Sequence, residues 1–192
     1  MMRFTTMKTK LRKYPSIFLI LLLAISSCFL TGCVNQHPKD SKKSSQGESV
    51  ETMLEITDPK EKQAVLNAKA KVKALSGNPR IVATSPAVAD ICDKLDLDLV
   101  GVPKSSVSKI PSRYKKVKKV GLDMSPDMEI VSSLNPDWIL APSSLETDLK
   151  PKFEELKNTE YAFLNLRSVQ GMYRSVQELG EIFGKQQEAE KM

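Results

Sequence analysis

From Arg80 onward, short apolar runs alternate with segments of helical periodicity, and this alternation limits the possible folds more than any other feature. Short apolar runs predict buried strands, whereas apolar residues spaced three and four apart predict one face of a helix. Five strands are expected, at residues 80–85, 99–102, 118–122, 137–141 and 161–166. Strands that alternate with helices are typical of a parallel sheet covered on both faces. The predicted fold class is therefore α/β, a Rossmann-like lobe with a short parallel sheet flanked by helices.

The helices between these strands are predicted at residues 86–95, 126–134 and 168–183, with a further helical stretch near 153–157 that starts or kinks at Pro151. Another helix precedes the sheet. Asp58 is its expected N-cap, Pro59 its first residue, and Gly77 and Pro79 its end. The predicted organisation places this N-terminal helix at residues 57–78 and the α/β lobe at residues 79–184.

The first 33 residues hold five basic residues, no acid and the apolar run "IFLILLLAISSCFL", which are the marks of a secretory signal. The run ends at "LTGC", which resembles the lipobox of bacterial lipoproteins, and an uncleaved signal anchor is the alternative. Residues 1–33 are thus a predicted lipoprotein signal peptide, and Cys33 is the predicted site of diacylglycerol and palmitate attachment. Residues 34–56 are a predicted flexible tether. The expected location is the extracellular face of the cell membrane.

Catalytic patterns are absent from the sequence. It contains neither a Gly-rich phosphate loop nor a Cys/His cluster with zinc spacing. The one histidine, His37, lies in the predicted tether, so no base is available to a nucleophile. After removal of residues 1–33 the charges nearly balance, which gives no reason to expect a nucleic-acid partner. We therefore expect a binding protein rather than an enzyme.

Ligands of open parallel sheets bind beyond the carboxyl ends of the strands. Two of these ends carry Ser-Pro, at Ser85 and at Ser125, which is typical of an N-cap followed by the first helical residue. Such helix starts favour anions, and Lys104 and Lys109 would add positive charge. Ser-Pro also starts helices without any ligand, so the pattern is only consistent with an anion-tolerant mouth.

Met124 lies just before the expected cap at Ser125. An apolar residue there normally packs on the fourth helical position, which is the charged Glu129. A cap at Asp123 would weaken this argument. The residues alone leave two readings open, core or surface packing and contact with a ligand. A thioether suits haem iron or copper rather than magnesium or calcium.

The motifs "KLDLDLVGVP", "IPSRYKKV" and "VGLDMSPDMEIV" resemble those of IsdE-type haem receptors, the lipoproteins of Gram-positive haem ABC importers. The resemblance implies that Met124 is an axial ligand of the haem iron and that Glu129 docks onto the permease. It also implies upstream cell-surface haem-relay proteins as partners. The loops implied to line the haem edge and propionates comprise Ser85, Pro86, Ala87, Val88, Lys104, Ser105 and Ser106.

Such receptors have two lobes joined by a long helix, and the second axial ligand is a histidine of the C-terminal lobe. The sequence resembles the N-terminal lobe only, because it reaches "GKQQEAEKM" where the inter-lobe helix is expected to start, at residues 185–192. Three alternatives remain open: the same fold carrying a ferric siderophore or cobalamin, a nonfunctional fragment of such a receptor, and an enzyme built on a nucleotide-binding-like sheet.

Overall fold

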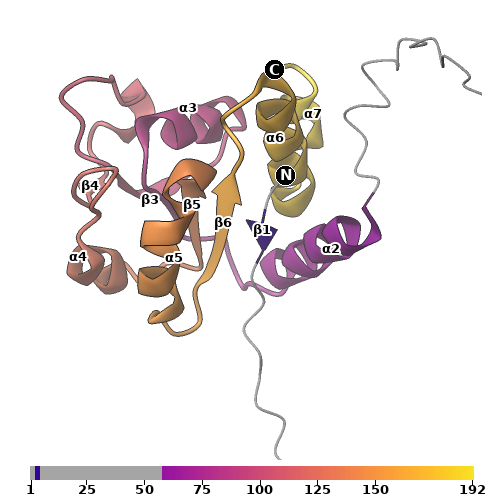
Figure 1. The fold of residues 1–192 in the computed structure, drawn as a ribbon, viewed down its shortest axis with the longest axis horizontal. Coiled ribbons are helices and arrows are strands. Elements are labelled where there is room, and N and C mark those ends of the chain that lie inside the picture. Colours follow the sequence, from indigo (N-terminus) through magenta and orange to yellow (C-terminus); the bar gives the residue numbers. More distant parts are fainter. Residues whose placement is uncertain (1–2, 5–57) are drawn as a thin grey trace, which may run out of the picture. The chain divides into compact units, whose positions relative to one another are not determined.

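The computed structural model describes residues 3–4 and 58–192. Their strands form one sheet in the order β1-β6-β5-β2-β3-β4 (Figure 1). The five strands from β2 to β6 pair in parallel, and β1 pairs antiparallel with β6. Their bounds are Arg3–Phe4 for β1, Ile81–Ala83 for β2, Leu99–Val102 for β3, Lys118–Lys119 for β4, Trp138–Pro142 for β5 and Glu160–Leu164 for β6. The predicted α/β lobe with a short parallel sheet is confirmed. Strand β1 was not expected from the sequence.

Helices cover both faces of the sheet, and each face has its own core (Figure 1). Alternate residues of a strand point to opposite faces, so Trp138 and Leu140 of β5 enter one core, and Ile139 and Ala141 enter the other. The helices of the first core are α2 (Pro59–Lys73), α3 (Pro86–Lys94), α6 (Val169–Phe183) and α7 (Gln186–Ala189). Those of the second are α4 (Met128–Ser133) and α5 (Glu146–Glu154).

Local capping explains why the helices α2, α3 and α6 begin where the sequence predicts. The side chains of Asp58, Ser85 and Ser168 accept hydrogen bonds from backbone N–H groups in the first turns, at 2.8, 3.2 and 3.0 Å. Each bond satisfies a donor that has no partner within the helix. Helix α6 ends at Gly184, whose φ of 70° lies in the left-handed region that favours glycine.

The helix expected from Pro126 begins instead at Met128, so the prediction of Ser125 as its N-cap is wrong. Asp127 is the cap, and its carboxylate accepts from the backbone N–H groups of Glu129 and Ile130, each at 3.1 Å. Pro126 is buried and forms an isolated antiparallel bridge with Gly121. This bridge delays the helix by two residues.

Three further boundaries differ from the expectation. Helix α2, whose end was expected at Gly77 and Pro79, ends at Lys73. The strand predicted at residues 118–122 is only Lys118–Lys119, because Gly121 turns the chain away with a φ of 94°. The helix expected to start or kink at Pro151 begins at Glu146 and contains Pro151 in its interior. Proline removes one backbone donor there, and the helix ends at Glu154.

The predicted tether, Cys33 and all of the predicted signal peptide except the two residues of β1 lie outside the described residues. Within residues 3–4 and 58–192, every helix is too short or too polar to cross a membrane. Residues 185–192, expected to start an inter-lobe helix, form the four-residue helix α7 and a turn that pack beside α6.

Candidate functional site

A tight turn at residues 120–127 presents Met124 at the carboxyl end of β4. The backbone N–H of Asp127 donates to the carbonyl of Val120 at 2.7 Å, which closes the turn at its base. Gly121 is required within it, because a Cβ at that position would lie 2.8 Å from the Asp127 nitrogen. The Met124 side chain is 70% exposed. The turn is therefore fixed at its base by the backbone and exposes a thioether at its tip.

The loop that follows β3, residues 103–111, lies against this turn. The backbone N–H of Lys104 donates to the Gly121 carbonyl at 2.6 Å, and the Ser105 hydroxyl accepts from the backbone N–H of Ser108 at 3.0 Å. Lys104 and Ser106 are exposed, and Ser105 is half-buried. The loop residues predicted to line a haem edge are therefore neighbours of the turn that carries Met124.

Two apolar side chains of this region were missed by the sequence reasoning. Val107 is 95% exposed and Leu122 is 59% exposed. Large apolar side chains that are exposed together with Met124 on neighbouring loops are typical of a binding surface rather than of a core. A signal for Val107 is present in the sequence, since "SSVSK" places one branched apolar residue inside a polar loop.

The predicted residues at the start of α3 are placed less favourably for side-chain contacts. The Ser85 hydroxyl accepts from the Val88 backbone, and both side chains are buried. Pro86 is half-buried, and Ala87 is exposed. The position of this helix start, after the carboxyl end of β2, is as predicted. Among the four residues, Ala87 has the most accessible side chain.

Glu129 lies in the first turn of α4, where its side chain is exposed. Trp138 and Tyr161 are core residues, with 2% and 5% exposure. Burial raises the pKa of the Cys92 thiol to about 12; the charge of Arg113 lowers this pKa to a smaller extent, and that of Asp93 raises it slightly. Cys92 is therefore a protonated core residue and offers no reactive thiolate.

The turn presents one soft ligand atom, the sulfur of Met124, together with exposed apolar and basic side chains. No group of three or more His, Cys, Asp or Glu side chains suited to a metal occurs in the described part of the chain. A single thioether is a soft ligand that haem iron accepts as an axial partner. Leu122 in the turn and Val107 in the adjoining loop are exposed apolar side chains, and Lys104 of that loop is an exposed cation.

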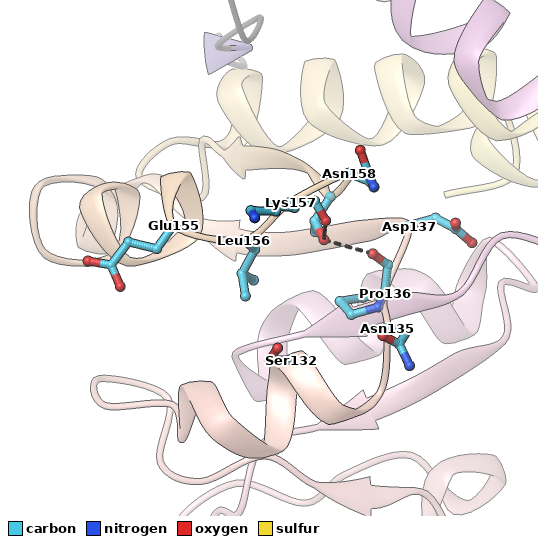
Figure 2. A pocket seen from close by; sticks show the side chains of 9 residues that line it. Ser132, Asn135, Pro136, Asp137, Glu155, Leu156, Lys157 and Asn158 are labelled. Atoms are coloured by element: carbon cyan, nitrogen blue, oxygen red, sulfur yellow. Dashed lines mark hydrogen bonds between the residues drawn. The ribbon is translucent and has the colours of Figure 1, made fainter.

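A cavity of about 570 Å³ lies elsewhere, near the amino ends of β5 and β6 (Figure 2). Thr159 there donates to the carbonyls of Pro136 and Lys157, and Asn135 and Asn158 form left-handed turns. This cavity is at the opposite end of the strands from Met124. Its polar lining and its position do not match the expected ligand mouth.

Comparison with known proteins agrees with the fold. Residues 81–192 match the family model described as periplasmic binding protein. The high-affinity heme uptake system protein IsdE of Staphylococcus aureus is 36% identical over 117 residues, which cover 61% of this chain and 39% of that protein. The structure of IsdE complexed with heme matches with a TM-score of 0.56, covering 60% of this chain and 44% of that one.

Two further solved structures are similar. An ABC transporter substrate-binding protein of Listeria monocytogenes is 45% identical with a TM-score of 0.57, covering 60% of this chain and 44% of that chain. The petrobactin-binding protein YclQ of Bacillus subtilis is 25% identical with a TM-score of 0.52, covering 59% and 42%. Each match covers less than half of the relative, which fits the N-terminal lobe of a larger binding protein. The chain belongs to the periplasmic binding protein family.

Proposed function

We propose that this lobe binds haem at the 120–127 turn, with the Met124 thioether as an axial ligand of the iron. The observation that carries the proposal is the 70% exposed Met124 side chain on a turn closed by backbone hydrogen bonds at the carboxyl edge of the sheet. Leu122 is exposed in the same turn and Val107 in the adjoining loop, and we propose that both contact the apolar ring. A methionine in such a position has no packing role to explain it.

The neighbouring loops would hold the rest of the ligand. Lys104 and the polar groups of Ser105 and Ser106 are suited to the propionates, and Ala87 marks where the start of α3 reaches the same edge of the sheet. Ser85, Pro86 and Val88 would act through the position of their backbone rather than their side chains. Haem is the cargo here, and the proposed function is binding and transfer without covalent chemistry.

We propose that the protein delivers its ligand to the permease of an ABC importer, which is supported by the family match and by the similarity to an ABC transporter substrate-binding protein. We propose Glu129 as a docking contact, because its exposed carboxylate can pair with a permease arginine without a change of fold. Cell-surface haem-relay proteins would supply the ligand. The Cys33 lipid would hold the protein at the extracellular face of the membrane, and Cys33→Ala should release it from the membrane fraction.

Haemin titration of the purified full chain in a neutral detergent tests the proposal. The parent chain should give a Soret band, and Met124→Ala should shift that band and weaken binding by about tenfold or more, equivalent to about 1.4 kcal/mol. Leu66→Ala is the control, because Leu66 is an apolar side chain of α2 that is 44% exposed and lies in neither loop. An unchanged Met124→Ala spectrum would remove this residue from the site.

A ferric siderophore is the second candidate, because the petrobactin-binding protein YclQ is among the similar structures. It would use the cations of the mouth rather than the thioether. Thermal unfolding with haemin and with ferric siderophores separates the two, because a bound ligand stabilises the folded state. If a ferric siderophore stabilises the chain, haemin does not, and Met124→Ala leaves that stabilisation unchanged, the ligand is a siderophore rather than haem.

A further inference from the structure

We propose that a lysine-rich edge of the lobe attracts anionic metal chelates and speeds their capture at the 120–127 turn. The lysine-rich edge consists of Lys104, Lys109, Lys115, Lys116 and Lys118. The inference rests on the proposed function and adds to it that the ligand is negatively charged, as haem is through its two propionates. It concerns the rate of association rather than the contacts of the bound state.

The charge of this edge is unusually one-sided. Residues 104–119 carry seven Lys or Arg and no Asp or Glu. All five lysines of the edge are exposed, and none lies within 4.0 Å of an acidic group in residues 58–192. Lysines elsewhere do form pairs: Lys69 pairs with Glu181 at 3.3 Å, and Lys94 with Asp90 at 3.1 Å. The positive charge of the edge is therefore available to a partner.

The other two cations of residues 104–119 are already engaged. Arg113 donates to the carboxylates of Asp96 and Asp98 at 2.8 Å each. The ammonium of Lys119 approaches the carbonyl of Tyr114 at 3.5 Å. These contacts fix the course of the segment, and they leave the five remaining lysines as its free charges.

The edge is continuous with the proposed haem site. Lys118 lies in β4, the outer strand beside β3, and its Cα pairs in register with that of Gly101 (Figure 1). The chain then enters the 120–127 turn at once. On the other side of the turn, the backbone of Lys104 bonds to the Gly121 carbonyl. Lys104 and Lys118 thus lie on the two segments that adjoin the turn carrying Met124.

Acidic groups near the turn only partly oppose this charge. They are Asp123, Asp127 and Glu129, three carboxylates against five free lysines. The Asp127 carboxylate caps α4, and the Asp123 carboxylate accepts from the Met124 backbone at 3.0 Å. Both carboxylates keep their charge, so the three acidic groups offset three of the five free lysines and leave an excess of two positive charges among these residues.

A field of this kind acts over roughly one Debye length, about 8 Å at physiological salt and about 30 Å at 0.01 M. Steering of this type raises association rates by about 10- to 1000-fold in favourable cases, and it weakens steeply with salt. Lysines along an outer strand also oppose edge-to-edge pairing of sheets, and that role alone predicts no effect on ligand capture. Association kinetics therefore distinguish the two roles.

The experiment measures the association rate constant of haemin with the full chain by stopped flow, in a neutral detergent, over a series of salt concentrations. The test variant carries Lys115→Gln, Lys116→Gln and Lys118→Gln, which leaves Lys104, Lys109 and the other proposed ligand contacts in place. The matched control removes the same charge from exposed lysines elsewhere, by Lys60→Gln, Lys62→Gln and Lys73→Gln. Haemin dimethyl ester, which lacks the propionate charges, is the second probe.

At low salt the test variant should associate about three- to tenfold more slowly than the parent, with a dissociation rate within about twofold of it. The difference should disappear at about 1 M salt, where the Debye length is about 3 Å. The control variant should associate with haemin as fast as the parent does. Haemin dimethyl ester should associate at the same rate with the parent and with both variants. Equal salt dependence of parent and test variant would overturn the inference alone. Failure of the parent to bind haemin at all would overturn both the inference and the proposed function.

Discussion

The exchange Glu178→Gln tests a pair of buried carboxyl groups between α2 and α6. Glu178 is completely buried, and neither of its carboxyl oxygens has a hydrogen-bond partner among the described residues. Glu61 of α2 is 7% exposed, and its Oε1 is likewise without a partner there. The pKa of Glu178 is raised to about 8, mainly by burial and secondly by the neighbouring carboxyl of Glu61. The charge of Arg174 lowers this pKa, but only weakly. Glu178 is therefore protonated at neutral pH in the folded chain.

The sign of the pH dependence follows from the raised pKa. The stabilising contribution of Glu178 is complete below its unfolded pKa, near 4.5, and is lost as the pH rises towards and through about 8. At about 1.36 kcal/mol per pKa unit, the free energy of unfolding falls by about 3 kcal/mol between pH 4.5 and pH 7. Glutamine cannot ionise, so it removes this loss, but its buried NH₂ costs about 1–3 kcal/mol if a donor stays unpaired.

We therefore expect the order of stability to reverse with pH. The parent should be more stable than Glu178→Gln near pH 4.5, and the variant should be more stable by about 1–3 kcal/mol near pH 8.5. Urea unfolding of the full chain in a neutral detergent, followed by the fluorescence of Trp138, measures the free energy of unfolding of the parent and of Glu178→Gln at each pH. Trp138 is the one tryptophan of the chain and is 2% exposed, so it reports on the loss of the core.

The control is Glu155→Gln at the end of α5, where the side chain is exposed. It should change the free energy of unfolding by no more than about 0.5 kcal/mol at any of these pH values. Parallel pH profiles for the parent and Glu178→Gln would refute the reasoning, since they would mean that the Glu178 carboxyl titrates alike in the folded and unfolded states.

Three further predictions concern the turn, the core and the thiol. Gly121→Ala should destabilise the fold by about 1–3 kcal/mol in urea unfolding and weaken haemin binding in titration, because the φ of Gly121 is 94°. The control Gly77→Ala should leave both measurements unchanged, because a Cβ at Gly77 meets open space. Tyr114→Phe should cost about 1–3 kcal/mol in the same unfolding assay, because it leaves the buried Leu97 carbonyl without the tyrosine hydroxyl; equal stability would show that water replaces it. With the other two cysteines changed to serine, Cys92 should resist a thiol reagent at about pH 8 until the chain unfolds, and rapid native labelling would contradict its raised pKa.

Much of the fold follows from local signals in the sequence. The starts of α3 and α6 are predictable because Ser85 and Ser168 cap them through bonds made within the same turn. The start of α4 is different, since Ser125 and Asp127 are both good caps two residues apart. The bridge between Gly121 and Pro126 decides between them, and its formation depends on how β4 leaves the sheet.

The candidate site was predictable in part. The packing argument for Met124 depended on Ser125 as the cap of α4, and because Asp127 is the cap, that argument does not explain the 70% exposure of Met124. The exposure of Leu122 was not predictable, because an apolar residue after a strand is more often part of the core. The buried pair Glu61 and Glu178 was also hidden, since glutamates in helices are normally solvated and the packing of α2 along α6 is a long-range contact.

The two-residue strand β4 has a consequence for the behaviour of the protein at high concentration. It is the outer strand next to β3, and it consists only of Lys118 and Lys119. A second copy approaching this strand meets like charges and few backbone groups to bond. Crowding should therefore favour separate molecules over ribbons of joined sheets at this edge. Neutralising these lysines to improve crystallisation would remove that protection.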